Sequence, residues 1–366
     1  MEASGSILTD QFTQLLARLP AGLDLDRLAA ERGALLRRRE ISNGADLLRL
    51  ALARGPGGLS LRETAAWAGQ VDLAQLSNPA VKYRLDQAGG FLEGVVEHLL
   101  AARVGAAPPC WHGRSLRLAD GTSLSQPGSG GTDWRVHAVF DLGRGGFADL
   151  QLTDARGAES LARGQPVAGE VRIADRYFGQ ARAMAAFRTA SGNQADFIVR
   201  LRWNALRLRQ ADGRRFDLIA TLAALPAGEV PQEVAVQAAL GRHSAALPLR
   251  LILLRKPAEA AAATRRALLR YASRKQKKLD PRTQVAGEFM ILATSLPAEH
   301  YPADQVLAAY RLRWQIELAF KRLKSLLHID QLPTLTPAGS RSWLYAHLVM
   351  ALLCDDISQD FLAAFP

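Results

Sequence analysis

The spacing of apolar residues predicts that the first third of the chain is helical. Leucine-rich stretches with helical periodicity fill residues 1 to about 108 and are separated by glycine-containing breaks. Ser60 and Glu63 form a capping-box sequence, and Ser77 followed by Asn78-Pro79 offers a cap and an N-terminal proline for the next helix. Two such helices, the second with basic residues, are compatible with a helix-turn-helix DNA reader and equally with an ordinary helical domain.

The period changes to alternation after a linker rich in glycine and proline at residues 105–113. Strands are predicted at 115–120, 134–141, 146–153, 170–175 and 196–202, with helices opening at 159–163 and spanning 179–190. Three meandering strands, a helix and a further strand fit an α/β layer built like ribonuclease H.

An insertion interrupts this α/β layer. β-leaning segments at 214–222 and 247–254 and a basic helix at 262–278 precede a strand at 288–294, where the core resumes. We therefore expect an all-α N-terminal domain, an α/β core in two parts, and a β-rich basic subdomain inserted between those parts. The predicted boundaries are 1–108 for the helical domain, 109–202 and 287–366 for the core, and 203–286 for the insertion.

The segment YRLRWQIELAFKRLK, residues 310–324, combines an apolar face with a polar stripe when it is taken as one helix. Four polar residues fall on a stripe about 60° wide: Tyr310, Arg313, Glu317 and Lys324. A carboxylate between two cations and a phenol suits a metal-holding acid beside groups that grip phosphate oxygens. A solvated face with ion pairs is the alternative.

The formal net charge of +11 is concentrated in one region. Residues 1–110 hold 12 basic and 12 acidic residues, whereas residues 197–290 hold 18 basic and 7 acidic residues, a difference of +11. A concentrated basic region predicts a polyanionic partner, with nucleic acid the first candidate and generic solubility the alternative. Arg37-Arg38-Arg39 is either a local phosphate patch or a solvated charge run.

The remaining composition predicts a soluble protein of the bacterial cytoplasm. A chain of 366 residues allows two or three domains, and no stretch approaches the roughly 18 uncharged apolar residues of a membrane span. The start, MEASGSILTD, lacks the basic and apolar regions of a secretory signal. Cys110 and Cys354 lie far apart without metal-ligand spacing, so we expect reduced thiols.

Three carboxylates are the candidate chemistry. Asp120 and Asp175 each end a predicted strand, and Glu317 lies on a later helix. A ribonuclease H-like core would bring them together to hold two Mg²⁺ ions, with Mn²⁺ able to substitute. Each aspartate alone could instead be a strand-end turn residue.

Other polar residues have weaker positions for this chemistry. Three further carboxylates lie inside or after less defined strand ends: Asp141, Asp154 and Glu159. His137 and His328 are expected to be structural or adjacent to the nucleic acid, and not metal ligands.

The spacing Tyr, two residues, Arg, three residues, Glu, six residues, Lys resembles the signature of IS4-type DDE transposases. The upstream segments LADGTSL, with Asp120, and IADRYFG, with Asp175, resemble the same family and follow its order. The resemblance implies that these two aspartates and Glu317 are catalytic and metal-binding. It also implies that the helix residues Tyr310, Arg313 and Lys324 bind phosphates near the transposon end. The family more often has glycine where Tyr177 stands.

Further DNA contacts are implied by the resemblance. Arg176 lies in the loop after the second aspartate, and Lys321 and Arg322 would extend phosphate contact or simply be solvated. Trp203 is our candidate for an aromatic that stacks on a flipped base, with a core tryptophan as its alternative.

The implied function is cut-and-paste transposition of an insertion sequence. Such an enzyme binds terminal inverted repeats, hydrolyses one strand at each end, and joins the freed 3′-hydroxyls to target DNA through a hairpin intermediate. Its implied partners are double-stranded DNA and a second copy in a two-fold dimer, without membrane attachment, in the cytoplasm at the nucleoid. The alternatives are a metal-dependent nuclease without strand transfer, or a truncated, inactive DNA-binding relic, since family members usually continue past the helix at 344–353.

Overall fold

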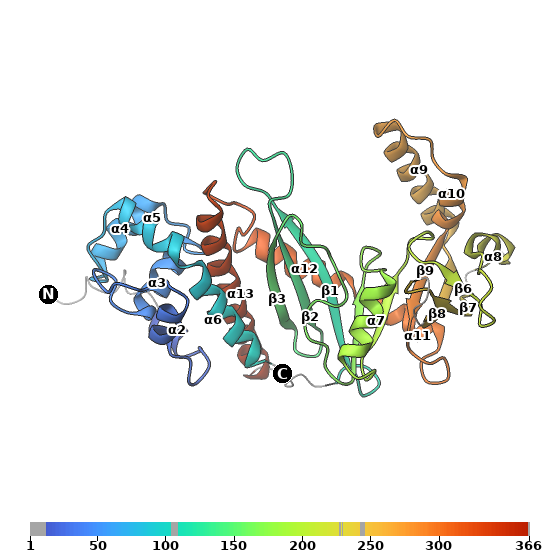
Figure 1. Cartoon of the computed structure of the whole chain (residues 1–366), viewed down its shortest axis with the longest axis horizontal. Coiled ribbons are helices and arrows are strands. Elements are labelled where there is room, and N and C mark those ends of the chain that lie inside the picture. The colour runs from blue at the N-terminus through green and yellow to red at the C-terminus, as the bar shows by residue number, and fades with distance from the viewer. Residues whose placement is uncertain (1–11, 104–108, 227, 229, 242–245, 365–366) are drawn as a thin grey trace. The chain divides into compact units, whose positions relative to one another are not determined.

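The structure is a computed structural model that describes residues 12–103, 109–226, 228, 230–241 and 246–364. The chain forms two compact units, each assembled from separate stretches (Figure 1). Unit 1 comprises residues 1–107, 121–157 and 317–366, and unit 2 comprises residues 108–120 and 158–316. Both units are therefore discontinuous in sequence.

Unit 1 consists of helices and one β-hairpin. Its elements are α1 (Phe12–Leu16), α2 (Leu25–Glu31), α3 (Gly44–Arg54), α4 (Leu61–Gln70), α5 (Asn78–Gln87), α6 (Gly89–Ala101), the strands β2 (Trp134–Asp141) and β3 (Gly146–Asp154), and α13 (Pro337–Ala364). The long helix α13 packs against α3, α5, α6 and β3. The chain's last helix thus completes the core of its N-terminal helices.

Local signals explain where several of these helices begin. Ser60 and Glu63 exchange side-chain and backbone hydrogen bonds at the start of α4, so the predicted capping box is confirmed. Ser77 accepts from the Ala80 N–H at the start of α5, and Pro79 occupies the first turn, as predicted.

Arg103 holds the end of α13 to the β-hairpin. Its side chain is 2% exposed and donates to the Phe147 carbonyl at 3.0 Å, while pairing with Asp355 at 3.5 Å and Asp356 at 2.8 Å. Asp355 also accepts from the Phe147 N–H at 2.8 Å. Burial raises the pKa of Asp355, and the Phe147 N–H and the Arg103 cation oppose that rise.

Unit 2 is built on a mixed sheet. Its strands lie in the order β1-β4-β5-β9-β8-β7-β6, and β1 continues into unit 1. Their bounds are β1 (Ser115–Leu124), β4 (Glu170–Ala174), β5 (Asp196–Arg200), β6 (Leu208–Arg209), β7 (Gln232–Ala238), β8 (Leu247–Arg255) and β9 (Phe289–Thr294). The strands β1, β4 and β5 are parallel, and the pairs from β5·β9 to β6·β7 are antiparallel.

Unit 2 also contains helices, which connect the strands of this sheet or follow them in sequence. They are α7 (Ala181–Ala190), α8 (Leu218–Ala224), α9 (Ala258–Arg274), α10 (Pro281–Gly287) and α11 (Ala303–Arg311), while α12 (Trp314–Ser325) begins in unit 2 and continues into unit 1.

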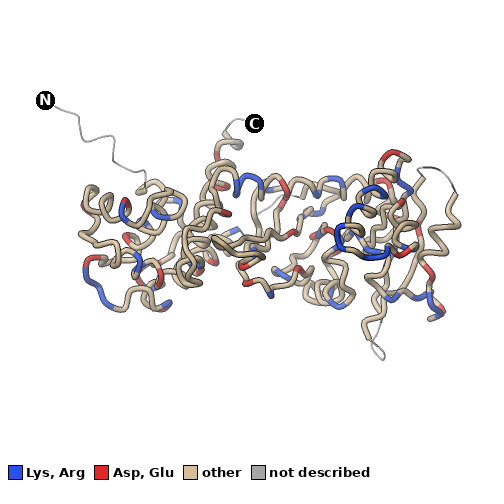
Figure 2. The backbone as a smooth tube through the Cα atoms, turned by 90° about the horizontal axis from the view of Figure 1, so that it is seen from above, with Lys and Arg blue, Asp and Glu red and all other residues tan. Residues whose placement is uncertain are grey.

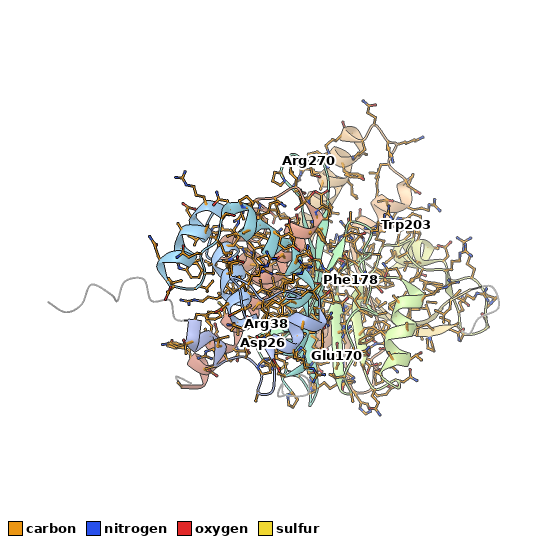
Figure 3. The ribbon with its side chains drawn as sticks, turned by 60° about the vertical axis from the view of Figure 1, so that its left-hand side comes forward. Asp26, Arg38, Glu170, Phe178, Trp203 and Arg270 are labelled. Carbon is orange, nitrogen blue, oxygen red and sulfur yellow. The ribbon has the colours of Figure 1, made fainter. Side chains whose placement is uncertain are left out.

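The parallel strands are buried on both faces, as near-continuous apolar runs predict. Every residue of β4 is buried, including Glu170 and Arg172, whose side chains are joined by a 2.6 Å hydrogen bond (Figure 3 labels Glu170). Arg172 also lies 4.6 Å from the centroid of the Phe187 ring of α7. A paired and stacked cation can lie in this core because its charge is compensated.

Most predicted elements are confirmed. The strand at 134–141 is β2 with the same bounds, the strand at 247–254 is β8, and the basic helix predicted at 262–278 is α9. The strand predicted at 115–120 runs on to Leu124, so Asp120 lies inside β1 and not at its end. Of the predicted linker, residues 105–108 lie outside the described residues.

Three predictions of local structure are wrong. Residues 159–163 form turns and no helix, because Arg172 draws the carbonyls of Leu161 and Arg163 toward its guanidinium. The β-leaning segment 214–222 contains the start of α8, which Asp217 caps by accepting from the Ala220 N–H at 3.0 Å. Residues 310–324 form the end of α11 and most of α12, with a break between them.

Two further observations concern the whole chain. Cys110 in unit 2 and Cys354 in unit 1 are both free and exposed. Among the helices of the described residues, we find none with both the length and the apolar character that crossing a bilayer requires.

Candidate functional site

One row of the parallel sheet carries three charged residues. The paired register of β1, β4 and β5 aligns Ala119 with Ala174 and Ala174 with Val199. The residues that follow are Asp120, Asp175 and Arg200. Because adjacent strands are about 4.8 Å apart, these side chains lie close together at the C-terminal ends of the paired segments, which we call the sheet edge. Asp120 and Asp175 are thus brought together, with a cation in the third position.

Arg313 joins this row from the turn between α11 and α12. Its Nη1 lies 3.6 Å from Oδ2 of Asp120, and the two side chains are 21% and 19% exposed. The helix break brings this about, since the Arg313 N–H bonds to the Tyr310 carbonyl and the Ile316 N–H bonds to the Arg313 carbonyl. The break is therefore formed by two short-range turns, which end one helix and start the next.

Tyr310 lies beside the same groups. It is a buried residue on α11, 7% exposed. Burial raises the pKa of its hydroxyl, the charges of Arg313 and Arg200 lower it, and Asp175 raises it further. The hydroxyl is therefore protonated at neutral pH and surrounded by the charged groups of the sheet edge.

Glu317 lies in the first turn of α12 and belongs to unit 1. It lines an open hollow of about 620 Å³ together with Lys321, Lys324 and residues of the following turn. These three residues are four and seven positions apart, so they share one face of α12. Arg322 is exposed on the same helix. Of the predicted stripe, only Glu317 and Lys324 are on one helix, and Tyr310 and Arg313 precede it.

The residues at the sheet edge have the donor chemistry of a site for a hard divalent cation. Asp120 and Asp175 offer carboxylate oxygens, which Mg²⁺ and Mn²⁺ prefer. Oδ1 of Asp175 accepts from the Tyr177 N–H at 2.7 Å, which fixes the orientation of this carboxylate. Within the ranges that the structure describes, no three His, Cys, Asp or Glu side chains form a metal-binding group.

A basic cluster accompanies this edge, and the sequence did not single out two of its members. Lys256 follows β8 and donates to the Gly287 carbonyl at 2.7 Å. Burial, with a smaller contribution from the charges of Arg200 and Arg176, lowers the pKa of Lys256 to about 8. Arg200 ends β5 and Lys256 directly follows β8, whereas the strands predicted at 196–202 and 247–254 placed neither residue at a strand end, so the sequence carried no signal for them.

Tyr177 lies between two of the cations that follow the sheet edge. The guanidinium of Arg202 lies 4.2 Å, and that of Arg176 5.8 Å, from the centroid of the Tyr177 ring. Tyr177 itself is 51% exposed. An exposed aromatic between two guanidinium groups offers both stacking and charge to a ligand.

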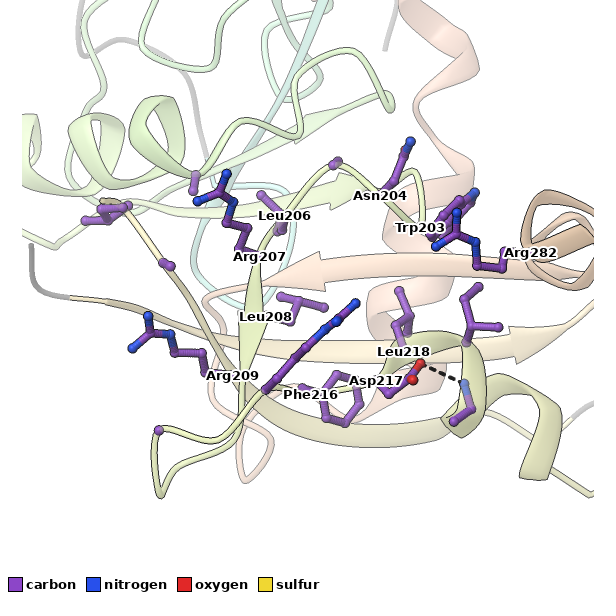
Figure 4. Close-up of a pocket in the computed structure, with 18 of the residues that line it drawn as sticks. Trp203, Asn204, Leu206, Arg207, Leu208, Arg209, Phe216, Asp217, Leu218 and Arg282 are labelled. Atoms are coloured by element: carbon purple, nitrogen blue, oxygen red, sulfur yellow. Dashed lines mark hydrogen bonds between the residues drawn. The ribbon is translucent and has the colours of Figure 1, made fainter. Parts of the chain in front are cut away.

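Trp203 lines a separate cavity of about 1200 Å³ (Figure 4). Its Nε1 donates to Oγ1 of Thr283 at 3.1 Å, and the Arg282 guanidinium lies 4.6 Å from its ring. Phe216 and several arginines also line this cavity: Arg182, Arg207, Arg209, Arg215 and Arg282. Trp203 is half-buried, with part of its surface facing the cavity.

The competing polar residues of unit 1 have local structural partners. Asp141 accepts from the Arg144 N–H at 3.1 Å, and Asp154 accepts from the Arg156 N–H at 2.9 Å, so both cap turns. The buried His137 is 3.0 Å from the Thr153 hydroxyl.

Comparison with known proteins adds a family. A family model described as Transposase DDE domain matches residues 111–354. The InsL protein of insertion sequence element IS186A from Escherichia coli (strain K12) is 43% identical over 352 residues, which cover 96% of this chain and 94% of that protein. The transposase for insertion sequence element IS421 from Escherichia coli is 43% identical over 353 residues, with the same coverage.

Structural comparison is less informative. The piggyBac transposase in a synaptic complex with hairpin DNA, solved by cryo-EM, aligns with a TM-score of 0.42 and 8% identity. The alignment covers 97% of this chain and 74% of that chain.

Proposed function

This chain belongs to the Transposase DDE domain family, and from that premise we propose that it is the transposase of an insertion sequence, cutting the element at both ends and joining the freed 3′ ends to target DNA. The observation that carries the proposal is the pair of aspartates that directly follows the last paired residues of β1 and β4. Fold alone does not fix function, so the chemistry is argued from these residues.

Asp120, Asp175 and Glu317 are the proposed catalytic acids. Together they would hold two Mg²⁺ ions, with Mn²⁺ able to substitute. When bound, the ions supply Lewis-acid stabilisation of the phosphoryl, attacking and leaving oxygens. Support comes from the carboxylate donor set at the sheet edge, from the position of Glu317 in the first turn of α12, and from the order of the three acids in the family's pattern.

Neighbouring residues would position the DNA strand for cleavage. Arg313 and Arg200 supply positive charge next to the aspartates. With these cations the site attracts a phosphate more strongly than the two carboxylates would alone. Tyr310 keeps its proton at neutral pH, so its hydroxyl can donate to a phosphate oxygen. Polar side chains that order the scissile phosphate before reaction reduce the entropic cost of reaching the transition state.

Further DNA contacts complete the proposal. Lys321, Arg322 and Lys324 would bind phosphates along α12, and Arg176 would bind one after the second aspartate. Trp203 would stack on an extrahelical base, which the aromatic wall of its cavity supports.

The architecture is proposed on the same basis. We infer a ribonuclease H-like core, supported by the parallel order β1-β4-β5 and by the antiparallel β2–β3 hairpin. The N-terminal helices would bind DNA, and residues 203–286 would be an inserted subdomain. The active form would be a homodimer that holds two element ends, acting at the nucleoid in the cytoplasm.

The decisive experiment compares Mg²⁺-dependent cleavage of DNA carrying the element's own end by the wild type and by Glu317→Gln. We expect site-specific cut ends and hairpins from the wild type and none from the variant. Glu299→Gln, which neutralises an exposed glutamate, is the matched control and should cleave as the wild type does. Equal cleavage by Glu317→Gln would remove Glu317 from the acids. Specific binding without cleavage by the wild type would make the chain a DNA-binding relic.

The products separate transposition from simple hydrolysis. A transposase joins pre-cleaved ends to a target plasmid, whereas a nuclease with the same acids cuts without joining. Strand transfer by the wild type in this assay is the expected result.

A further inference from the structure

A basic arm, defined as residues 260–279, combines α9 with the turn that follows it. This stretch of 20 residues contains no Asp or Glu and seven Lys or Arg, bounded by Glu259 and Asp280. The seven are Arg265, Arg266, Arg270, Arg274, Lys275, Lys277 and Lys278, and all are exposed. The arm therefore has a formal charge of +7 over 20 residues, compared with +11 for the whole chain.

The arm turns one face to the rest of unit 2. Thr264 accepts from the Lys256 ammonium at 3.1 Å, and Ala272 is buried. A Cβ placed on Gly287 would lie 3.1 Å from Cδ1 of Leu268, so α9 approaches the end of α10 closely at that point. Thr264, Leu268 and Ala272 are four positions apart and form one stripe along α9, and this stripe anchors the arm to unit 2.

The opposite face carries arginines at the same spacing. Arg266, Arg270 and Arg274 lie about 200° around the helix from the anchoring stripe and span about 12 Å along it. Figure 3 labels Arg270 on this helix, and Figure 2 shows the Lys and Arg positions along it. The stripe therefore faces away from the anchor.

The tip of the arm is a hydrogen-bonded turn. The Gln276 N–H bonds to the Ser273 carbonyl and the Lys277 N–H bonds to the Ala272 carbonyl, both at 2.9 Å. Gln276 has a φ of 50°, the left-handed conformation that ends many helices. Lys275 and Lys277 are thus presented from a defined turn at the end of the arginine stripe.

In the part of the chain that the structure describes, none of the arm's cations forms an ion pair with a carboxylate, whereas the adjacent Arg282 pairs with Asp280 at 2.7 Å. Like charges four residues apart destabilise a helix. An external polyanion would remove this repulsion, which distinguishes the arm from an ordinary solvated helix face.

We propose that the basic arm binds the phosphate backbone of a DNA duplex without regard to sequence, and that this duplex is the target DNA. Lys and Arg on a 12 Å stripe and its tip can reach several phosphates, which carry most of the affinity for DNA. Apart from Gln276, the polar side chains of the arm that could contact DNA are mostly cations, which bind phosphates whatever the base sequence, and Asn, Asp and Glu are missing from residues 260–279. Target DNA varies in sequence while the element's end is fixed, so a surface that contacts the backbone suits the target. The target assignment rests on the proposed function.

The test variant replaces three stripe residues: Arg266→Gln, Arg270→Gln and Arg274→Gln. The matched control replaces the same residues with Lys and retains their charge. Glutamine and lysine are both good helix formers, so α9 should persist in each. Binding to a random-sequence duplex is measured against salt, alongside cleavage of the element's end and transfer of pre-cleaved ends into a plasmid.

We expect the glutamine variant to bind the random duplex at least about tenfold more weakly, with a salt slope reduced by up to about 2.7 for three lost phosphate contacts. Its end cleavage should stay within about twofold of the wild type, while strand transfer falls at least about tenfold in line with the lost target affinity. The lysine variant should retain all three activities.

Several results would overturn the proposal. Unchanged duplex binding in the glutamine variant would remove the arm as a DNA surface, and so would a preference for vesicles of anionic phospholipid. A parallel loss of end cleavage would assign the arm to the element's end. Equal loss in the lysine variant would indicate guanidinium-specific base reading. A wild type that cuts no end would overturn the proposed function and the target assignment, while the salt-dependent binding would still test the arm itself.

Discussion

Among single residues, the candidate site places two carboxylates and a cation at corresponding positions of three neighbouring strands. Asp120 and Asp175 at neighbouring strand positions repel each other when both are ionised. Arg313 lies 3.6 Å from the first, and Arg200 occupies the next position along the row. The carboxylates of the sheet edge therefore lie beside cations that can also bind a phosphate.

Arg200 is the residue of this row that the sequence did not point to, and its substitution is a direct test. Arg200→Gln should lower the rate of end cleavage by about 100-fold, the scale of losing one preorganised group that stabilises developing charge. The measurement is single-turnover cleavage of the element's end, with thermal unfolding to confirm an intact fold.

The matched control is Arg214→Gln, which removes an exposed arginine paired with Asp212 at 2.6 Å in a loop of the same unit. It should cleave within about twofold of the wild type, because an exposed pair contributes at most about 1 kcal/mol. A cleavage rate in Arg200→Gln equal to that of the control would assign Arg200 a purely structural role.

His347 predicts a dependence of stability on pH. It is 1% exposed on α13, its ring lies 3.7 Å from that of Trp343, and burial lowers its pKa to about 4 from 6.5. Between those two values the unfolded chain binds a proton that the folded chain does not. Stability should therefore fall as pH decreases from about 6.5 to about 4, by up to about 3 kcal/mol from this group.

Urea unfolding between pH 4.5 and 7 measures this contribution. His347→Phe keeps a ring against Trp343 and should lose the corresponding part of the pH slope, whereas His300→Gln, at an exposed position, should keep the slope of the wild type. Identical slopes for all three proteins would show that His347 titrates normally in the folded state.

At the scale of elements, the break between α11 and α12 is the feature that sequence could not supply. The helical period runs without interruption from Tyr310 to Lys324, and no glycine or proline marks a stop. The break places Arg313 in a turn, where it reaches Asp120, and leaves Tyr310 buried on α11. Such tertiary interactions override local periodicity.

Other elements were predictable because their signals are local. The bounds of β2 and the cap of α4 follow from alternation and from a capping box within a few residues. The turns at 159–163 were not predictable, since the Arg172 side chain that binds their carbonyls lies nine or more residues further along the chain. The Asp217 cap of α8 was a local signal that the β-leaning composition obscured.

The packing of α13 predicts a large effect for one buried cation. Arg103→Met should reduce the free energy of unfolding by about 3 kcal/mol, because it removes a buried cation and leaves the half-buried carboxylates of Asp355 and Asp356 without it. The loss should be smaller when Asp355→Asn accompanies it. Urea unfolding of both variants measures the difference.

Arg18→Met is the matched control within unit 1, because it also breaks an ion pair to α13. Arg18 pairs with Asp360 at 2.6 Å, but the two side chains are 33% and 69% exposed. The loss should be about 1 kcal/mol or less. Similar losses from both single substitutions would contradict the burial argument.

At the scale of the whole molecule, the interleaving of the two units predicts which fragments can fold. Residues 158–316 alone lack β1, so β4 loses the parallel partner that pairs with it from Glu170 to Ala174. Every residue of β4 is buried in the intact chain, and an unpaired strand of this kind at a sheet edge promotes aggregation. This fragment should be insoluble or aggregated by size-exclusion chromatography, and residues 109–316, which restore β1, should yield more soluble protein. A monomeric 158–316 fragment with cooperative unfolding would contradict this expectation.

The distribution of charge was predictable from sequence, but its geometry was not. Counting places the excess at residues 197–290. Only the structure shows that Arg266, Arg270 and Arg274 share a face opposite the anchoring residues of α9, and that a turn orders the lysines after them. Helical spacing suggests the stripe, while the direction in which it points depends on packing against α10.

The two cysteines give the protein a built-in pair of attachment points for spectroscopic probes. Both cysteine residues are exposed, and each unit contains one of them. The partly buried sulfur of Cys354, next to Asp355, has a raised pKa, so less of it is thiolate at neutral pH. A limiting amount of maleimide dye should therefore label Cys110 first, and a second dye at higher pH should label Cys354. Energy transfer between the two dyes would then report the separation of the units in solution, without any substitution in the chain.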